Sequence, residues 1–375
     1  MNIKLLFIVN DPAFFLSHRL PVALEAKKRG YDVHVATSLG RSVQDIQKKG
    51  FIHHYLPISR SGMNIINEIK TFKAILLLLR KVNPQLVHLV TLKPVLYGAV
   101  AARISKVPAV VAAVSGLGYI FTDMSLKAFF LRKIVTIGYY FAFQHPNIHI
   151  IFQNYDDLSV IQKLIALEEG KTTTIRGSGV DLASFCPIPE PQGVPTVVLA
   201  SRMLKDKGVV EFVDAAKIVL KNNFFAKFLL IGDVDIGNPN SITIDQLKSW
   251  HNSGVVVWKG FSNDIKSELS GAHIVVLPSY REGLPKVLIE AAACGRAVIT
   301  TDVPGCRNAI DVNKSGLLVP VKDSKALADA IEKLLLNSDI RKAMGKQGRK
   351  FAERMFDINS VVDKHLIIYS HLCSK

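Results

Sequence analysis

The chain has 375 residues, enough for two domains that each bury their own apolar core. Its hydrophobic content of 49% and charged content of 21% are those of an ordinary globular protein and exclude wholesale disorder. The net charge of +16 is concentrated early, since residues 1–133 hold 19 basic and 6 acidic side chains, a balance of +13, whereas the remainder holds 28 and 25. Such a one-sided positive field suits an anionic membrane surface, a phosphorylated substrate or nucleic acid.

The cysteines and the N-terminus indicate a cytoplasmic protein. Cys186, Cys294, Cys306 and Cys373 show no paired spacing, so we interpret them as reduced thiols rather than as a disulfide frame or a zinc site. The apolar run at residues 5–9 is too short for a signal peptide and predicts a first strand. No stretch approaches the roughly 18 apolar residues that a membrane span needs, so we expect any membrane association to be peripheral.

Strand-like and helix-like segments alternate along the whole chain, a pattern typical of parallel sheets wrapped by helices. In the first half, strands are expected at residues 3–9, 32–37, 51–56, 86–90, 109–114, 149–153 and 173–177. In the second half, they are expected at residues 196–201, 227–232, 255–261, 274–277, 297–301 and 317–321. The alternation predicts an α/β protein with two doubly wound, Rossmann-like domains.

The boundary between these domains is predicted at a proline-rich segment. Residues 186–195 contain four prolines, and proline continues neither a helix nor a central strand. We therefore expect an N-terminal domain at 1–185, a hinge linker at 186–195 and a C-terminal domain at 196–356. The helical spacing of apolar residues after 357 predicts a last helix at 357–375, which we expect to pack back on the N-terminal domain.

Two segments of the first half have the composition of interfacial helices. Residues 65–81 set Lys70 and Lys73 beside apolar side chains, and residues 126–143 set Lys127, Arg132 and Lys133 among aromatic ones. Basic residues that flank an apolar face are typical of helices that lie on a membrane. The alternative is that both are core helices whose charges face water.

The segment 201–208 follows the first strand of the second domain and opens a helix. Arg202, Lys207 and the exposed amides of that helix are placed to converge on one anion, because arginine offers a fork to two oxygens and lysine adds a point charge. A solvated turn is the alternative. Asp233 and Asp235 invite a divalent-metal site, but the surrounding sequence fits a strand-end turn and the two cations make a metal superfluous. We expect no metal.

Residues 279–291, which read SYREGLPKVLIEA, are the most informative segment. They follow a strand at 274–277, and Pro285 suits the first position of a helix. Glu282 is then expected in the loop above the strand and Glu290 about a turn and a half into the helix. Ligands of parallel sheets bind outside the carboxyl ends of strands, where both carboxylates would lie. The alternatives are a surface pair between Lys286 and Glu290 and a helix-dipole role for Glu282.

The motifs of the second half form an ordered set: SRMLKDKG at 201–208, LLIGD at 229–233, VWKGF at 257–261, HIVVLPSYREGLPKVLIEAAACGRAVITTDVPGCRNAI at 273–310 and SGLLVPV at 315–321. This set resembles the C-terminal domain of retaining glycosyltransferases of family 4, which have the GT-B fold of two facing Rossmann-like domains with a cleft between them. The first half resembles the family through FFLSHRLPVALEAKKRGYDVHVAT, LVHLVTLKPVLYGAVAAR and AVSGLGYIF. These pieces look closest to the subgroup that elongates undecaprenyl-diphosphate-linked glycans for O-antigen, capsule or protein glycosylation.

The resemblance implies a role for each matching position of the donor site. Arg202 and Lys207 would bind the donor diphosphate, Glu290 the ribose hydroxyls, and Glu282 the donor sugar. Arg202, Lys207 and Glu282 are thus the predicted catalytic residues. Two cations that face a departing diphosphate stabilise the charge that grows on it in the transition state. The other donor-binding positions are Gly283, Leu284, Pro285, Gly260 and Phe261.

The first domain departs from the family pattern in two loops. Many members carry a Gly-Gly loop after the first strand, where this chain reads NDPAFF at 10–15. Many also have a histidine near the reacting sugar, where this chain reads SGLG at 115–118. No catalytic histidine is therefore transferred, and His18 and His88 remain candidates beside the alternative of packed or surface histidines. The acceptor-binding candidates are His18, Arg19, Lys93, Ser115 and Gly116.

We therefore predict a glycosyltransferase that is peripheral on the cytoplasmic face of the inner membrane. It would move a hexose or N-acetylhexosamine from a UDP-sugar to a polyprenyl-diphosphate-linked saccharide with retention of configuration, and its basic N-terminal domain would contact an anionic membrane surface. The alternative is a GT-B sugar-nucleotide epimerase or hydrolase. Nucleic-acid binding rests on charge alone, without a basic aromatic groove or a known module. A nicotinamide dehydrogenase is disfavoured because no Gly-x-Gly-x-x-Gly follows the first strand.

Overall fold

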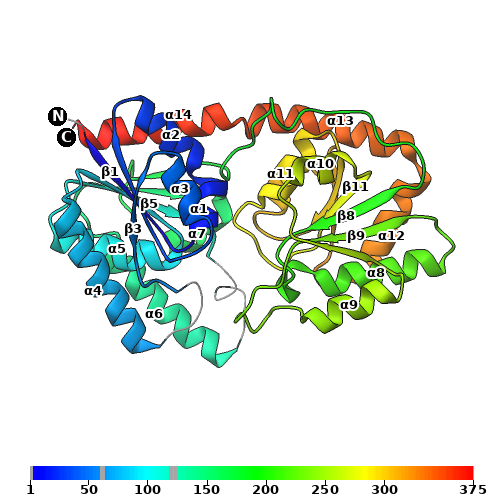
Figure 1. The fold of residues 1–375 in the computed structure, drawn as a ribbon, viewed down its shortest axis with the longest axis horizontal. Helices are drawn as coiled ribbons and strands as arrows, with labels where there is room; N and C mark the ends of the chain where they lie inside the picture. The colour runs from blue at the N-terminus through cyan, green and yellow to red at the C-terminus, as the bar shows by residue number, and fades with distance from the viewer. Residues whose placement is uncertain (1–2, 60–63, 118–120, 122–124, 375) are drawn as a thin grey trace. The chain divides into compact units, whose positions relative to one another are not determined.

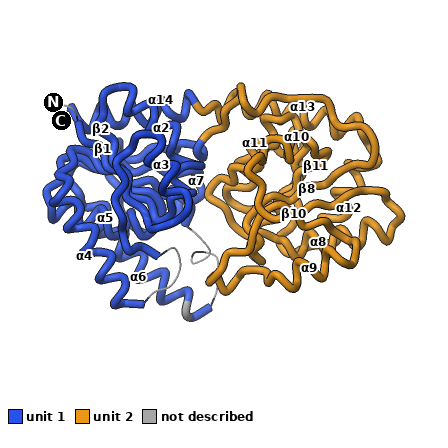
Figure 2. Tube along the Cα trace, in the orientation of Figure 1, with its two compact units in different colours: residues 1–178, 359–375 blue, residues 179–358 orange. Residues whose placement is uncertain are grey.

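The computed structural model describes residues 3–59, 64–117, 121 and 125–374, and it divides into two compact units (Figure 2). Unit 1 comprises residues 1–178 and 359–375, and unit 2 comprises residues 179–358. Each unit is built on a parallel sheet (Figure 1). The prediction of two Rossmann-like α/β domains is confirmed.

In the described part of unit 1, seven parallel strands run in the order β3-β2-β1-β4-β5-β6-β7. Their bounds are β1 Lys4–Val9, β2 Asp32–Thr37, β3 Ile52–Tyr55, β4 Leu86–Val90, β5 Ala109–Val114, β6 Ile148–Phe152 and β7 Thr172–Thr174. The central strands are rich in Val, Leu and Ile and are buried on both faces, as a sheet covered by helices requires. The strand order reverses between β1 and β4, and ligands of such sheets bind at the carboxyl edge near that reversal.

The helices of unit 1 lie on both faces of this sheet. They are α1 Pro12–His18, α2 Leu20–Lys28, α3 Val43–Lys48, α4 Ile65–Val82, α5 Leu92–Ile104, α6 Leu126–Ala142, α7 Tyr155–Leu164 and α14 Ile358–Cys373. Helices α4, α5 and α6 pack side by side over one face (Figure 1). From Asn359 onward α14 belongs to unit 1, where the Asn147 amide donates to the Leu372 carbonyl at 3.0 Å.

In unit 2, six parallel strands run in the order β10-β9-β8-β11-β12-β13. Their bounds are β8 Thr196–Ala200, β9 Lys227–Ile231, β10 Val257–Gly260, β11 Ile274–Leu277, β12 Ala297–Thr301 and β13 Gly316–Val319. The helices are η2 Lys205–Lys207, α8 Val209–Lys221, α9 Ile244–Asn252, α10 Ile265–Ser270, α11 Lys286–Ala293, η3 Arg307–Ala309, α12 Ser324–Leu336 and α13 Ser338–Met355. Helix α12 packs beside α8, and α13 packs beside α11 on the opposite face (Figure 1).

The proline-rich segment 186–195, predicted as a hinge linker, lies within unit 2. Glu190 accepts two hydrogen bonds from the Arg341 guanidinium, at 3.0 and 2.9 Å. The Arg296 guanidinium donates to the Ile188 carbonyl at 3.0 Å. The prolines prevent regular structure here, but they leave carbonyl oxygens and the Glu190 carboxylate that buried arginines can bind.

In the ranges that the structure describes, no helix combines the length and the apolar character needed to cross a membrane.

Candidate active site

Two loops of unit 2, one after β8 and one after β11, meet at the carboxyl edge of the sheet. Lys207 ends η2, and its ammonium donates to Glu282 Oε1 in the loop before α11. Only 17% of the Lys207 side chain and 13% of the Glu282 side chain are exposed. Ser279 donates its hydroxyl to the same carboxylate oxygen at 2.8 Å. The structure therefore brings together two predicted catalytic residues that lie 75 positions apart in the sequence.

Gly208 permits this approach of the two loops. Its φ is +71°, and a Cβ at this position would lie 2.2 Å from the Pro278 carbonyl oxygen. Next to it, the Tyr280 amide donates to the Asp206 carbonyl at 2.9 Å. The turn that carries Lys207 is thus docked on the backbone of the loop that carries Glu282, and only glycine fits at the contact.

Tyr280 belongs to this site, although the sequence analysis did not select it. Its hydroxyl donates to Glu211 Oε1 on α8 at 2.6 Å, and Lys322 Nζ lies 5.0 Å from the centre of its ring. Burial and the Glu211 carboxylate raise the pKa of Tyr280 above its usual value. A tyrosine beside Glu282 was visible in the sequence, but its partner on α8 was not.

Arg202, predicted to converge with Lys207 on one anion, has an acidic partner of its own. Its guanidinium Nη1 donates to Asp235 Oδ2, which also accepts from Asn238 Nδ2 at 3.1 Å. The Arg202 side chain is 41% exposed. The two cations are therefore paired with different carboxylates, and an incoming diphosphate would compete with both.

Asp233 and Asp235, the Asp-x-Asp pair, connect neighbouring loops through hydrogen bonds. Asp233 Oδ1 accepts the Phe261 amide at 3.1 Å, while its carbonyl accepts the Met203 amide at 3.0 Å. Together with the Arg202 contact to Asp235, these bonds join the loops after β8, β9 and β10. Across the described residues, no group of three or more His, Cys, Asp and Glu side chains is arranged to hold a metal ion.

The two donor-site positions after β10 differ in exposure. Gly260 has a φ of +71°, and its carbonyl accepts the Gly232 amide at 2.7 Å. Gly232 itself lies so close to the Ser201 carbonyl oxygen that a Cβ would be 1.8 Å from it. The Phe261 side chain, by contrast, is 68% exposed. The backbones of the loops after β8, β9 and β10 thus pass close to one another at the sheet edge. The Phe261 ring beside them is exposed to solvent.

Glu290 lies inside α11 and is only 5% exposed. Its Oε1 lies 3.1 Å from Lys286 Nζ, so the pair four residues apart does exist, but it is mostly buried rather than solvated. Burial raises the pKa of Glu290 above its usual value of 4.5, and the Lys286 ammonium partly offsets that shift. The carboxylate is held in place on a rigid element.

The loop that connects Glu282 with α11 is held in place by its own buried Leu284 and by a close contact with Gly305. Helix α11 begins at Lys286, and Pro285 precedes it as the N-cap instead of occupying the first helical position. Leu284 is 7% exposed. Gly305 has a φ of +82°, and a Cβ there would lie 2.4 Å from the Glu282 carbonyl oxygen and 2.6 Å from that of Gly283. Gly305 therefore supports the backbone of the predicted sugar-binding loop.

In unit 1, the candidates at the α1–α2 junction differ in accessibility. His18 stacks on Phe14, with ring centroids 4.0 Å apart, and its Nδ1 lies 2.7 Å from the Ser17 hydroxyl oxygen. Arg19 is only 2% exposed, and its Nη1 donates to the His18 carbonyl at 3.0 Å. Burial lowers the pKa of Arg19 to about 10. The side chain turns inward where α1 ends, so it lies in the interior of unit 1 and not on its surface.

His88 is a core residue of unit 1. It lies on β4, is fully buried, and hydrogen-bonds through Nδ1 to the Tyr369 hydroxyl of α14. Its ring stacks on Phe7 at 4.9 Å and on His365 at 5.6 Å. Burial lowers the pKa of His88. The alternative of a packed histidine is the one that the structure supports.

The other acceptor candidates lie at the carboxyl edge of the unit 1 sheet. Lys93 Nζ donates to Glu68 Oε1 at 2.6 Å and to the Ser59 hydroxyl at 3.2 Å. Ser115 follows β5, and Gly116 has a φ of +117°. Gly118 and the rest of the motif up to residue 120 lie outside the described residues.

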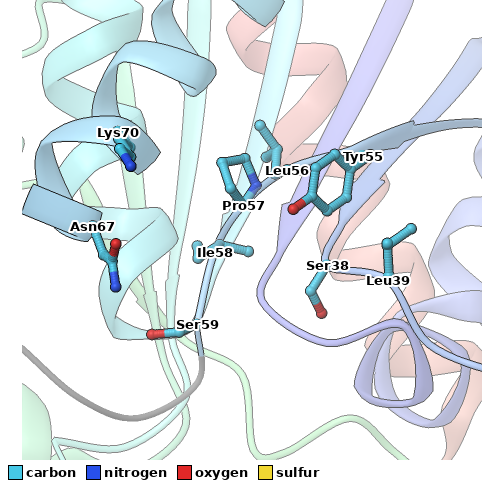
Figure 3. A pocket seen from close by; sticks show the side chains of 9 residues that line it. All are labelled: Ser38, Leu39, Tyr55, Leu56, Pro57, Ile58, Ser59, Asn67 and Lys70. Atoms are coloured by element: carbon cyan, nitrogen blue, oxygen red, sulfur yellow. The ribbon is translucent and has the colours of Figure 1, made fainter.

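Near Lys93, unit 1 also contains a cavity of about 310 Å³ (Figure 3). It lies where β2 and β3 end and α4 begins. Its lining residues are Ser38, Leu39, Tyr55, Leu56, Pro57, Ile58, Ser59, Asn67 and Lys70. The sequence analysis selected only Lys70 among them, because no local pattern links these three segments.

Comparison with known proteins identifies the family and the fold of the chain. The family described as "Glycosyl transferases group 1" matches residues 185–351, and "Glycosyl transferase 4-like" matches residues 4–153. The N,N'-diacetylbacillosaminyl-diphospho-undecaprenol alpha-1,3-N-acetylgalactosaminyltransferase of Campylobacter jejuni is 30% identical over an alignment that covers 96% of this chain and 98% of that protein. The UDP-Gal:alpha-D-GlcNAc-diphosphoundecaprenol alpha-1,3-galactosyltransferase of Escherichia coli is 24% identical over an alignment that covers 84% of this chain and 82% of that protein.

A solved structure shares the fold over its whole length. Anabaena HepE in complex with UDP matches with a TM-score of 0.78 at 15% identity, covering 99% of this chain and 100% of that one. The family assignment rests on the C. jejuni relative, because its sequence identity with this chain extends over nearly the full length of both proteins. The chain therefore belongs to the group 1 glycosyltransferases of family 4, which have the GT-B fold.

Proposed function

We propose that this glycosyltransferase is a retaining enzyme that moves a hexose or N-acetylhexosamine from a UDP-sugar to a polyprenyl-diphosphate-linked saccharide in the synthesis of a cell-surface glycan. The names of the C. jejuni and E. coli relatives support the acceptor class, because both specify a diphosphate-linked undecaprenol, and the E. coli name specifies UDP-galactose as donor. The observation that carries the proposal is the ion pair of Lys207 and Glu282 at the carboxyl edge of the unit 2 sheet.

In this proposal, the donor diphosphate replaces the carboxylates that now hold the cations. A diphosphate offers more charge and more acceptor oxygens than one carboxylate, so Lys207 and Arg202 would turn toward it. Glu282 would then accept hydrogen bonds from the donor sugar, with the backbone amides of Gly283 and Leu284. Glu290, fixed on α11, would accept hydrogen bonds from the ribose hydroxyls.

The acceptor hydroxyl would attack the anomeric carbon from the face on which the diphosphate leaves. The new carbon–oxygen bond forms while the bond to the phosphate oxygen breaks, and the hydroxyl proton passes to the departing diphosphate. Lys207 and Arg202 stabilise the charge that grows on that leaving group, and one such donor typically contributes about 10²–10³ in rate. We expect this reaction to need no metal ion.

We further propose that unit 1 meets the acceptor at an anionic membrane surface. The outward face of α6 carries large apolar side chains, each at least 46% exposed: Leu126, Phe129, Phe130, Ile134, Ile137, Tyr140 and Phe141. The opposite face, with Val135 and Tyr139, is buried in unit 1. Lys133 Nζ lies 4.8 Å from the centre of the Phe129 ring, while the side chain of Lys127 lies outside what the structure describes. An apolar face combined with positive charge is typical of interfacial helices.

The test is a screen of labelled UDP-sugars against synthetic polyprenyl-diphosphate monosaccharides, with and without a chelator. The proposal predicts transfer of label to at least one lipid acceptor, unaffected by chelation and with the anomeric configuration of the donor. UDP release or sugar inversion without any lipid acceptor would instead identify a hydrolase or an epimerase. Absence of transfer for every pair of substrates would contradict the proposal.

A further inference from the structure

We propose that Tyr280, through its hydrogen bond to Glu211 of α8, is a positioning residue for the transfer of the sugar. This role rests on the proposed function, because it concerns how the same site holds its donor. The segment 206–211 and the loop before α11 are joined by the ion pair of Lys207 and Glu282, which an incoming diphosphate would open. Tyr280 joins the same two segments by two further hydrogen bonds that do not involve this pair.

Both hydrogen bonds of Tyr280 are made to the segment that carries Lys207. Its hydroxyl donates to Glu211 Oε1 at 2.6 Å, and its amide donates to the Asp206 carbonyl at 2.9 Å. Glu211 follows Lys207 by four positions in the chain. Tyr280 precedes Glu282 by two. These bonds can therefore keep the two segments in register while Lys207 leaves Glu282 for a phosphate.

Glu211 depends on this hydrogen bond because it is a buried carboxylate. It is 8% exposed and lies in the first turn of α8, where the helix dipole favours a negative charge. In the part of the chain that the structure describes, its second oxygen, Oε2, is buried without a hydrogen-bond partner. Loss of a donor from a buried charged acceptor is costly, so the carboxylate should hold the Tyr280 hydroxyl firmly. Burial and this carboxylate raise the pKa of Tyr280, which keeps the hydroxyl protonated and able to donate.

The ring of Tyr280 is held by a different element. Lys322 Nζ, in the turn between β13 and α12, lies 5.0 Å from the ring centre, a distance typical of a cation–π contact. Helices α8 and α12 pack side by side, on the face of the sheet opposite to α11 (Figure 1). The side chain of Tyr280 thus connects the loop that leads into α11 with elements of the other face.

The loop that Tyr280 anchors carries the groups that would hold the donor sugar. The Ser279 carbonyl accepts from the Thr301 hydroxyl of β12, which fixes the start of the loop. Tyr280 fixes the next position, after which come Glu282 and the amides proposed to contact the sugar. A misplacement of about 1 Å at a reacting group can lower a rate about 10²-fold. UDP lacks the sugar, so we expect a defect in this anchor to affect turnover and not the binding of UDP.

The first experiment measures kcat, the donor KM and the affinity for UDP, with the UDP-sugar and lipid acceptor that the transfer screen identifies. Tyr280→Phe keeps the ring and its contact with Lys322 but removes the hydroxyl. We expect kcat to fall about tenfold, equivalent to about 1.4 kcal/mol, and the donor KM and the affinity for UDP to be unchanged. Asp214→Asn is the control, because it alters a carboxylate of the same helix whose partner Lys217 is half exposed.

Variants of Glu211 show whether the hydrogen bond itself is responsible. Glu211→Gln keeps an oxygen that can accept from the Tyr280 hydroxyl, and it should retain most of the activity. Glu211→Leu cannot accept and should lower kcat as much as Tyr280→Phe does. The double variant Tyr280→Phe with Glu211→Leu should be no slower than either single variant, since both remove the same bond. Additive losses would mean that the two residues act separately and would contradict the positioning role.

The kinetic outcomes separate this role from the proposed function. A Tyr280→Phe enzyme that turns over as fast as the wild type overturns the positioning role alone. A rise in the donor KM at unchanged kcat makes Tyr280 a donor-binding residue and overturns that role as well. Absence of transfer by the wild type contradicts the proposed function, and the second experiment then tests the loop directly.

The second experiment follows hydrogen–deuterium exchange of the peptide 279–288 by mass spectrometry, without ligand and with saturating UDP. We expect faster exchange in Tyr280→Phe than in the wild type and in Asp214→Asn, and a larger difference with UDP, because the ion pair is then open. Equal exchange in all three proteins would show that the loop does not need the Tyr280 hydroxyl. Faster exchange throughout unit 2 would indicate a loss of overall stability instead and would also overturn the positioning role.

Discussion

Lys207 and Glu282 form an ion pair between two loops that follow different strands of one sheet, and both side chains are less than one-fifth exposed. Because water is largely excluded from the pair, each charge depends on the other for neutralisation. Glu282 also accepts from Ser279, so it keeps one partner if Lys207 turns to a phosphate. The pair can thus be exchanged for a ligand without leaving Glu282 wholly unsatisfied.

Replacement of Lys207 by alanine should lower kcat by about 10²–10³, because the leaving diphosphate loses one positioned cation. Steady-state transfer assays with the UDP-sugar found in the screen provide the measurement. Lys205→Ala is the matched control, since Lys205 is an exposed lysine of the same short helix η2. A Lys207→Ala enzyme with kcat near the wild-type value would show that this residue does not serve the reaction.

The effect of Lys207 on stability can be separated from its effect on catalysis. Lys207→Ala leaves the Glu282 carboxylate without its cation in a poorly solvated place, so the single variant should also unfold more readily. Lys207→Met combined with Glu282→Gln removes both charges and should recover much of that stability while remaining inactive. Urea denaturation followed by circular dichroism compares the two.

Gly208→Ala should destabilise unit 2 by about 1–3 kcal/mol and lower activity, because the new Cβ would overlap the Pro278 carbonyl oxygen and push the loops apart. Gly254→Ala is the control, since Gly254 has a similar φ of +76° but open space around the position of its Cβ. The difference between the two variants in urea midpoint isolates the overlap from the backbone strain. Equal midpoints would mean that the loops do not need this close approach.

The raised pKa of Glu290 predicts a dependence of stability on pH. Between 4.5, its usual pKa, and the higher value in the fold, the folded chain holds a proton that the unfolded chain has lost, so stability falls as pH rises through this window. Glu290→Gln cannot titrate, and we expect its unfolding free energy to vary less with pH over the same range. Urea titrations at a series of pH values from 4.5 upward test this, and parallel curves for both proteins would contradict it.

The same carboxylate predicts how UDP affinity changes with pH. Protonation of Glu290 removes the charge that would accept hydrogen bonds from ribose, so wild-type affinity should weaken as pH falls through the raised pKa. Glu290→Gln should bind UDP more weakly at neutral pH and lose this dependence. Isothermal titration calorimetry measures both, and a wild-type profile that follows the variant's would remove Glu290 from the nucleotide site.

The outward face of α6 predicts binding to lipid vesicles. Phe130→Ser with Ile134→Ser should weaken partition onto phosphatidylglycerol vesicles at least tenfold, about 1.4 kcal/mol, and leave stability unchanged because both side chains are more than 60% exposed. Leu336→Ser is the control, an exposed leucine on α12 of unit 2. Co-sedimentation at low and moderate salt gives the partition coefficients. Equal partition of all three proteins would show that α6 does not enter the bilayer.

Much of the fold was predictable because its signals are local. Strands β2, β4, β5, β11 and β12 have the predicted bounds, since each is a short β-branched run that ends at a turn or a helix cap. The segment 274–291 likewise placed Glu282 in a loop and Glu290 in a helix. Such assignments depend only on the residues immediately before and after each segment.

The partners of the site residues were not predictable, because they depend on distant segments. Nothing near Lys207 indicates Glu282, and the Arg202 contact with Asp235 spans 33 positions. Arg19 was an acceptor candidate because a helix was expected to begin after Ser17, yet α1 ends at His18 and the Arg19 side chain turns into the interior toward Tyr369. Sequence patterns predict which face of a helix or strand is buried. The contacts of Lys207, Arg202 and Arg19 depend instead on how segments that are distant in the sequence pack together.

The ends of unit 2 are hydrogen-bonded to each other. The Val180 amide donates to the Phe356 carbonyl at 2.8 Å, and the Ile358 amide donates to the Val180 carbonyl at 3.1 Å. Unit 2 is thus a domain inserted between residues 178 and 359, with its entry and exit adjacent, as domain insertions require. Joining Ser178 to Asn359 through a few glycines should therefore yield a shortened protein that retains α14 and folds alone, so that unit 1 can be produced and studied without unit 2.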